Sequence, residues 1–231
     1  MILAGGIGSR MKSPELPKQF LEINNEPILI KTVRNFVDFG SFRAGVICCP
    51  VDWVEYTKSL LYEYGFSNYD IYAVPGGKNR NSSVQNGCRF FNEQYGISED
   101  DIVLTHDAVR PFIDAKIIKE NINATMEFGA ANTVMPMYDS VIRSTTGSFI
   151  NEQCERSELF RVQTPQSFRL KELTNLINSL SDEELEEFTD VATIFHSRGY
   201  RVKLVEGSDF NIKITTPFDM AVAEAIINNA P

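Results

Sequence analysis

Histidine and cysteine are scarce in this sequence, and neither occurs at a spacing that builds a metal site. The 231 residues include two histidines and four cysteines. Cys48, Cys49, Cys88 and Cys154 form no C-x-x-C pair, so a zinc site would need an unusual ligand set. We therefore expect the cysteines to be reduced and mostly buried, and we assign His106 a structural role.

Long apolar runs and an excess of basic residues are also missing. No apolar run approaches the roughly 18 residues of a membrane span, and residues 1–4 lack the basic-then-apolar form of a signal peptide. The formal charge is −9, whereas broad binding to nucleic acid or to an anionic membrane calls for a basic surface. We expect a soluble, cytoplasmic protein without nucleic-acid or membrane partners, in which local basic residues hold any anionic ligand.

Short apolar runs alternate with segments of helical period along the first 136 residues. Runs of about 4 to 6 apolar residues between turn residues indicate buried strands, and the segments of about 10 to 15 residues between them indicate crossover helices. The strand runs are MIL, AGVICC, YDIYAV, DIVLTH and ANTVMP. We predict an α/β, Rossmann-like fold in a single domain of residues 1–231, with a mostly parallel central sheet and helices on both faces.

The alternation breaks after residue 136. Residues 138–160 have the β-rich, glycine-broken pattern of a hairpin excursion. A helix is expected from 169 to 180, and Ser181 with Glu184 forms a capping box before a short acidic helix with a solvated face. RVKLVE and NIKIT have strand patterns, and TPFDMAVAEAIINN is a closing helix with Pro217 near its first turn.

Four segments that follow expected strands carry glycine or charge: GGIGSRM with PKQF, GGKNRNSS, HDAVRP and NIKITTP. Ligands of doubly wound sheets bind beyond the carboxyl ends of the strands. The four segments would place Arg10, Lys18, Arg110 and Lys213 around one sheet edge beside Asp107. Such an arrangement suits a polyanion bound together with a metal.

The first of these segments has a simpler interpretation as well. Gly5, Gly6 and Gly8 allow backbone amides to approach an anion closely. The G-x-G-x-x-G fingerprint fails, however, because Met11 stands at its last glycine, and no P-loop motif occurs. The glycines could therefore form an ordinary strand-to-helix turn, and Lys18 could be a surface lysine.

The other three segments also have structural alternatives. Arg80, Ser82 and Ser83 precede a helix whose N-terminal amides favour an anion, yet Ser83 could simply cap that helix. Asp107 could bind a divalent metal or cap the next helix. Lys213 could extend its amine to solvent.

Taken in order, the motifs resemble one family. L-A-G-G-x-G-x-R-M, P-K-Q-F, G-G-x-x-R-x-x-S, H-D-A-V-R-P-F, Q-T-P-Q-S-F and N-I-K-I-T, spread from residue 3 to about 224, look like those of the polyol-phosphate cytidylyltransferases. The two main branches of this family act on methylerythritol phosphate and on ribitol 5-phosphate. H-D-A-V-R-P-F together with Q-T-P-Q-S-F is the most specific part of the resemblance.

The resemblance implies a role for each matching position. It assigns the cytidine nucleotide to Leu3, Ala4, Gly5, Gly6, Gly76, Gly77, Arg80, Asn81, Ser82, Ser83, Asp107 and Ala108. It assigns catalysis at the phosphates to Arg10, Lys18 and Lys213, and the polyol phosphate to Arg110, Ser140, Arg156 and Thr164.

The family also implies a metal and a partner subunit. Asp107 would serve Mg²⁺ or another divalent cation, and the excursion at 138–160 would be a dimerisation arm that carries Arg156 to the partner's site. Many members have an acid directly before the N-I-K triplet, where this chain has Phe210. We therefore leave Asp209, one position earlier, out of the metal site.

The implied reaction is attack by a polyol phosphate oxygen on the α-phosphorus of CTP with release of pyrophosphate. The ILAGG opening, LPKQF at 16–20 and Thr189-Asp190-Val191 favour ribitol 5-phosphate as acceptor, which would give CDP-ribitol for teichoic acid or capsule synthesis. The alternative acceptor is 2-C-methyl-D-erythritol 4-phosphate of isoprenoid synthesis. A sugar-1-phosphate nucleotidyltransferase using UTP or GTP and a non-catalytic nucleotide-binding module are further alternatives.

Overall fold

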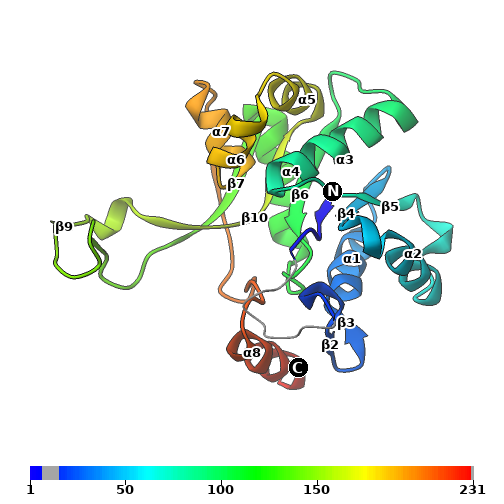
Figure 1. Cartoon of the computed structure of the whole chain (residues 1–231), viewed down its shortest axis with the longest axis horizontal. Coiled ribbons are helices and arrows are strands. Elements are labelled where there is room, and N and C mark those ends of the chain that lie inside the picture. The colour runs from blue at the N-terminus through cyan, green and yellow to red at the C-terminus, as the bar shows by residue number, and fades with distance from the viewer. Residues whose placement is uncertain (7–15, 230–231) are drawn as a thin grey trace.

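A seven-stranded sheet forms the centre of the computed structural model, which describes residues 1–6 and 16–229 (Figure 1). The strand order is β11-β7-β10-β6-β1-β4-β5. Their bounds are β1 Ile2–Leu3, β4 Gly45–Cys49, β5 Ile71–Pro75, β6 Ile102–Asp107, β7 Ala130–Pro136, β10 Phe160–Arg169 and β11 Lys203–Glu206. Only β10 runs antiparallel to its neighbours β6 and β7 in this sheet. The expected mostly parallel sheet is confirmed.

Helices cover both faces of this sheet because successive strand residues point to opposite sides. Leu3 and Cys48 pack in one apolar cluster with α3, whereas Ile2 and Ile47 pack in another with α1 and α2. The helices are α1 Ile28–Phe39, α2 Val54–Glu63, α3 Arg80–Tyr95, α4 Ala115–Phe128, α5 Leu170–Asn178, α6 Asp182–Glu187, α7 Val191–Ser197 and α8 Pro217–Asn228. Within the described residues, no helix combines the length and apolar character needed to cross a membrane.

The cysteines are free thiols, as expected from their spacing. Cys48, Cys49 and Cys88 are buried, and Cys154 is partly buried. Burial raises the pKa of both the Cys48 and the Cys88 thiol to about 12, so both stay protonated and unreactive at neutral pH.

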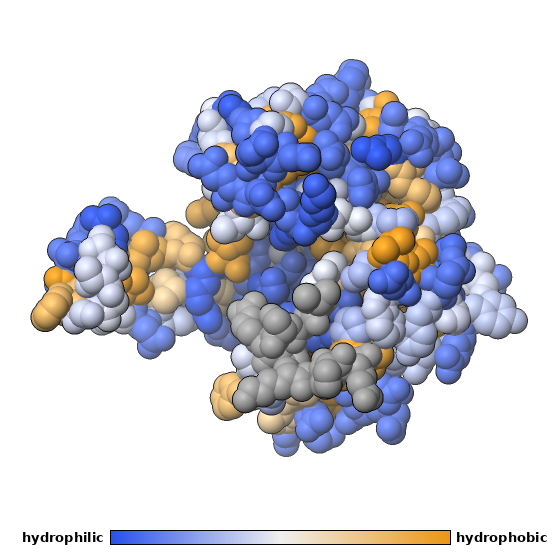
Figure 2. All heavy atoms as spheres, in the orientation of Figure 1, coloured by the Kyte–Doolittle hydropathy of each residue, from blue (hydrophilic) through white to orange (hydrophobic). Residues whose placement is uncertain are grey.

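Residues 137–159 form an arm that extends from the ends of β7 and β10 (Figure 1). Its tip is a two-stranded antiparallel hairpin of β8 Ile142–Arg143 and β9 Glu152–Gln153, which confirms the expected hairpin excursion. Figure 2 shows the arm standing apart from the body, with apolar side chains on its surface. The exposed apolar residues of the arm and its base include Tyr138, Ile142, Phe149, Ile150, Phe160 and Val162.

The expected strand at NIKIT is wrong. Residues 212–215 belong to no strand. Ile212 and Ile214 instead pack into a small cluster with Ile23, Val109 and Ala223, and the Ile214 amide donates to the Val109 carbonyl. The alternating apolar pattern therefore comes from a loop whose two isoleucines pack into the core. This anchoring matters for the site because Lys213 lies between the two isoleucines.

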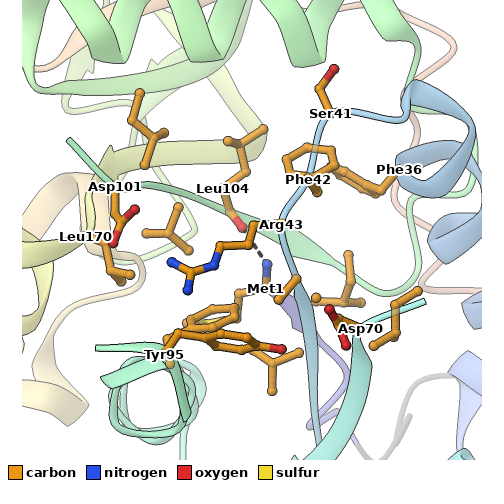
Figure 3. A pocket seen from close by; sticks show the side chains of 18 of the residues that line it. Met1, Phe36, Ser41, Phe42, Arg43, Asp70, Tyr95, Asp101, Leu104 and Leu170 are labelled. Atoms are coloured by element: carbon orange, nitrogen blue, oxygen red, sulfur yellow. Dashed lines mark hydrogen bonds between the residues drawn. The ribbon is translucent and has the colours of Figure 1, made fainter. Parts of the chain in front are cut away.

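The α-ammonium of Met1 is buried in a cavity of about 420 Å³ at the amino-terminal ends of β4 and β6 (Figure 3). It donates to the Leu104 carbonyl at 2.8 Å. Burial lowers its pKa to about 6 from an ordinary 8.0. β1 has two residues here while the flanking β4 and β6 have five and six, and Gly45 and Ile102 both line the cavity. The cavity therefore lies on the line of β1, beyond Met1.

We expect an engineered apolar extension fused to Met1 to raise the melting temperature by about 3 °C or more. The fusion replaces a buried amino group, which must lose its proton on burial, by an amide that can pair with β6, and it fills the cavity with apolar side chains. Because the native pKa lies below the ordinary value, the unfolded state binds more protons between pH 6 and 8. The stability of the unextended chain should therefore rise with pH across this range, and the extension should abolish that rise.

Thermal melts at pH 6, 7 and 8 of the protein, the apolar fusion and a Gly-Ser fusion of equal length test this expectation. The Gly-Ser fusion removes the same amino group without filling the cavity, so its melting temperature should rise less. A Gly-Ser fusion as stable as the apolar one would show that the cavity contributes nothing.

Candidate active site

A second cavity, of about 240 Å³, opens at the carboxyl ends of β1 and β6. It is lined by Leu3, Ala4, Gly5, Gly6, Lys18, Gln19, Gly77, Lys78, Asn79, Arg80, Ser83, Asp107, Ala108, Val109 and Lys213. These residues come from all four glycine- or charge-bearing segments of the sequence, the fourth of which is the loop before α8 that carries Lys213. The strand ends singled out in the sequence therefore converge on one shared cavity.

Asp107, the last residue of β6, is the electrostatic centre of this cavity. Its carboxylate lies 2.9 Å from Lys213 Nζ, 3.2 Å from Arg110 Nε and 3.7 Å from Arg80 Nε, and its side chain is 9% exposed. Burial alone would raise its pKa, but the positive charges of Arg80, Lys213 and Arg110 outweigh burial and hold the pKa well below its usual range. The carboxylate is therefore ionised at any physiological pH. It does not cap the next helix, because Asp114 caps α4.

Lys18 lies in a short 3-10 helix, Lys18–Phe20, that carries it over the end of β1. The residue is only 9% exposed, so the interpretation as a surface lysine is wrong. Its Nζ donates to the Ile214 carbonyl at 3.3 Å, next to Lys213. The neighbouring Gln19 donates to the Ala4 carbonyl at 2.7 Å and ties the 3-10 helix to the glycine loop. Two lysines from opposite ends of the chain are thereby fixed at one cavity.

The loop before α3 is held by hydroxyl groups. Ser83 Oγ accepts a hydrogen bond from the Gly77 amide at 3.0 Å and donates to the Asn79 carbonyl at 2.8 Å. Asn79 caps α3 and forms a capping box with Ser82, so the alternative that Ser83 is the cap is wrong. A Cβ on Gly77 would lie 2.6 Å from the Ser82 carbonyl carbon, a distance that real structures do not allow. Only glycine fits at this turn.

Arg110 and Thr164 lie behind the cavity wall. Arg110 is buried, and its guanidinium contacts Asp107 and donates to the Asn211 carbonyl at 2.7 Å. Burial lowers its pKa, but the guanidinium remains charged. Thr164 Oγ1 accepts from the Asp107 amide at 3.1 Å and lies 3.0 Å from His106 Nδ1. Both side chains therefore contact Asp107, and the polyol-phosphate role that the resemblance implies for them stays a prediction.

Several other expected site residues lie elsewhere. The Asn81 side chain faces away from the nucleotide side of α3 and donates to the Leu185 and Phe188 carbonyls at the end of α6. Ser140 and Arg156 are exposed on the arm, where Arg156 donates to the Tyr138 carbonyl. Gly76 lies in the loop before α3 and Ser82 in the first turn of α3, and neither lines the cavity. Arg10 and Gly8 fall outside the described residues.

The chain matches the model of the IspD family, 2-C-methyl-D-erythritol 4-phosphate cytidylyltransferase, over residues 1–229. The chain belongs to this family. The solved structure of a 4-diphosphocytidyl-2C-methyl-D-erythritol synthase from Anaerococcus prevotii is 28% identical, with a TM-score of 0.81 and coverage of 99% of this chain and 94% of that one. The fold and the cytidylyltransferase activity expected from the sequence are thus confirmed.

Two further solved structures in the IspD family are similar over their whole length. The 2-C-methyl-D-erythritol 4-phosphate cytidylyltransferase of Francisella tularensis is 28% identical, with a TM-score of 0.78 and 97% coverage of both chains. The enzyme of the same name from Thermus thermophilus is 26% identical, with a TM-score of 0.77 and coverage of 99% and 98%. These names favour the alternative acceptor of the sequence analysis over ribitol 5-phosphate, and they give no support to CDP-ribitol or teichoic acid synthesis.

The donors in the IspD-family cavity suit a divalent cation that is shared with phosphate. Among residues 1–6 and 16–229, Asp107 is the one acidic residue lining the cavity, and no group of three His, Cys, Asp or Glu could hold a metal alone. Mg²⁺ is commonly bound by one or two carboxylates together with substrate phosphates and water. Asp209 is exposed and pairs with Arg161 at 3.1 Å, which agrees with leaving it out of the metal site.

Gln19, Lys78, Asn79 and Val109 line the cavity although the sequence analysis gave them no role. All four belong to segments singled out in the sequence: PKQF, GGKNRNSS and HDAVRP. The sequence carried a signal for the segments, but not for the direction in which each side chain points.

Proposed function

We propose that this IspD-family enzyme transfers CMP from CTP to 2-C-methyl-D-erythritol 4-phosphate. The observation that carries the proposal is the cluster of Lys18, Lys213 and Arg80 around the ionised Asp107 at one cavity. The match of residues 1–229 to the family model supports the acceptor. Ribitol 5-phosphate remains the second candidate, because the ILAGG, LPKQF and Thr189-Asp190-Val191 patterns favour it.

In the proposed reaction, an anionic oxygen of the acceptor phosphate forms a bond to the α-phosphorus of CTP. The bond from that phosphorus to the oxygen bridging the β-phosphate breaks, and pyrophosphate leaves with the electron pair. The nucleophile carries its charge at neutral pH, so the enzyme needs no general base. Its contribution is positioning and charge neutralisation, as in other phosphoryl transfers.

The cations of the cavity are matched to this task. Lys18 and Lys213 act as compact point charges beside the reacting phosphates, while Arg80 can bind phosphate oxygens in a fork. The amides of Leu3 to Gly6 and of the loop before α3 provide uncharged donors for the nucleotide. Arg10, which follows Leu3 to Gly6 in the sequence, is proposed to add a further phosphate contact.

Mg²⁺ or another divalent cation at Asp107 would neutralise charge on the triphosphate. Asp107 is ionised and reaches the cavity, so it can take this role without a change in protonation. Lys213 and Arg80, which pair with Asp107 in the structure, would then turn toward the phosphates that bind together with the cation.

We also propose that the protein works as a homodimer through the arm. The exposed apolar residues Phe149, Ile150 and Phe160 on the arm and its base support a partner surface there. Ser140 and Arg156 would reach the acceptor phosphate in the site of the partner subunit. The cytoplasmic location expected from the sequence remains a prediction.

A pyrophosphate-release assay with the purified protein tests the proposed function. We expect turnover with CTP and 2-C-methyl-D-erythritol 4-phosphate, at a kcat/KM at least about 10-fold above that with ribitol 5-phosphate. The reverse preference would make ribitol 5-phosphate the acceptor. Activity with UTP or GTP and a sugar 1-phosphate would favour the nucleotidyltransferase alternative. CTP binding without turnover of any acceptor would favour the non-catalytic module.

A further inference from the structure

Two motifs that lie far apart in the sequence meet at their first residues. Gln163 opens QTPQSF on β10, and Asn211 opens NIKIT in the loop that carries Lys213. Asn211 Nδ2 donates to Gln163 Oε1 at 3.2 Å. Gln163 Nε2 donates to the Ser208 carbonyl at 2.9 Å, and the Ser208 amide donates back to Gln163 Oε1 at 3.3 Å. We call these three hydrogen bonds the amide clamp, because one side-chain amide holds the loop as a neighbouring strand would.

The amide clamp is buried and tightly packed. Gln163 is 7% exposed and Asn211 is fully buried. Asn211 Nδ2 donates to the Thr164 carbonyl of β10 as well, at 2.8 Å. A Cβ at Gly207 would lie 2.3 Å from Gln163 Oε1, so glycine allows the loop to approach this closely. Because a buried amide that loses its partner is costly, these bonds hold the loop firmly against β10.

Lys213 lies between two anchors of this loop. Asn211, two residues before it, belongs to the amide clamp. Ile214, directly after it, is fully buried, and its amide donates to the Val109 carbonyl at 2.9 Å. From this fixed backbone the Lys213 amine reaches the Asp107 carboxylate at 2.9 Å. The amide clamp is therefore the polar half of the support for Lys213.

We propose that Gln163 and Asn211 are positioning residues that hold Lys213 in place for transfer at the phosphates. The inference rests on the proposed function for the role of Lys213. Neither Gln163 nor Asn211 lines the cavity, so both act on the reaction through the lysine. Without the clamp the loop can shift, and a displacement of about 1 Å at a reacting group costs up to about 100-fold in rate.

Hydrogen exchange of the free protein tests the clamp without any assay of activity. Gln163→Met removes the side-chain amide at nearly constant length. We expect the backbone amides of Ser208 and Asn211 to exchange at least about 10-fold faster in this variant than in the wild type. Arg161→Gln is the matched control, because it removes the exposed pair with Asp209, another contact of the same loop with β10, and should leave these rates unchanged. Unchanged rates in Gln163→Met would overturn the proposal, whichever substrates the enzyme uses.

Kinetics in two backgrounds test the positioning role, with the acceptor that the pyrophosphate-release assay identifies. Gln163→Met and Asn211→Ala should each lower kcat by about 10- to 100-fold, and Arg161→Gln should stay within about 2-fold of wild type. In a Lys213→Ala background, Gln163→Met should cost less than about 2-fold more, because the amine that it displaces is already absent.

Losses that multiply when Gln163→Met is combined with Lys213→Ala would show that Gln163 acts by another route, and they would overturn the proposal. Wild-type kcat in Gln163→Met would overturn it as well. Melting curves accompany each variant. If Asn211→Ala fails to fold, Gln163→Met decides, because it keeps the length and the apolar stem of the side chain. If no acceptor is turned over, the proposed function fails, while the exchange rates still decide whether the clamp holds the loop.

Discussion

Replacing Lys213 or Lys18 by alanine is expected to slow turnover by at least about 100-fold, as loss of one preorganised donor to a developing charge typically does. Lys213 reaches the cavity from the loop anchored by Ile212 and Ile214, and Lys18 reaches it from the 3-10 helix over β1. Their compact charges stand where the phosphates of CTP would lie.

The two lysines differ in burial, so their controls differ. The Lys213 side chain is 42% exposed, but its amine pairs with the buried Asp107 carboxylate, so its loss should lower the melting temperature while the protein still folds. Lys18 is buried, and Lys18→Met keeps its apolar stem while removing the charge. Lys116→Ala, at an exposed position on α4, serves as the matched control with wild-type turnover. Near-normal turnover in Lys213→Ala or Lys18→Met would remove that lysine from the reaction.

Asp107→Asn is expected to reduce turnover by at least about 100-fold and to weaken the apparent affinity for Mg²⁺. The amide has nearly the same shape but cannot neutralise Arg80, Arg110 and Lys213, and it is a poor ligand for a hard cation. Kinetics over a series of Mg²⁺ concentrations measure both effects. Asp209→Asn is the matched control, because Asp209 pairs with Arg161 outside the cavity, and it should keep wild-type turnover.

The same substitution changes how stability depends on acid. The native pKa of Asp107 is depressed, so its contribution to stability is present above its ordinary pKa of 3.8 and is lost as the pH falls below it. Asp107→Asn should therefore melt below wild type at neutral pH, and the difference should shrink toward pH 3. A difference that grows on acidification would show that the three cations do not stabilise the native carboxylate.

The fold could be predicted from the sequence because periodically spaced apolar residues, separated by turn residues, recur along most of the chain. The apolar runs AGVICC and DIVLTH have the length of buried strands, and they form β4 and β6 in the structure. The strand expected at NIKIT is absent because alternating apolar residues indicate which side chains are buried, and not whether a partner strand is present. Ile212 and Ile214 are anchored in a loop beside Val109, and only the tertiary packing decides this.

The site was predictable in its segments and less so in its side chains. Asp107, Lys18 and Lys213 meet at the cavity because strand ends converge on one sheet edge. Asn81 was misplaced because one step along α3 turns a side chain by about 100 degrees, here toward the end of α6. Thr164 was assigned to the acceptor because its neighbours in sequence match a motif. In the structure its hydroxyl accepts from the Asp107 amide and lies beside His106, and its role toward the acceptor stays a prediction.

The acceptor shows a different limit. ILAGG, LPKQF and Thr189-Asp190-Val191 are few positions, and Asp190 is the cap of α7 in the structure, with its carboxylate bonded to Thr193. A residue that caps a helix is constrained by that cap whatever the substrate. The match of 229 residues to the family model therefore outweighs these patterns in choosing 2-C-methyl-D-erythritol 4-phosphate.

A crystal structure of the protein with CTP and Mg²⁺ tests the central claim most directly. We expect cytosine against residues 76–83, the triphosphate between Lys18 and Lys213, and Mg²⁺ held at Asp107. A nucleotide bound elsewhere, or one whose α-phosphate lies beyond the reach of both lysines, would contradict it.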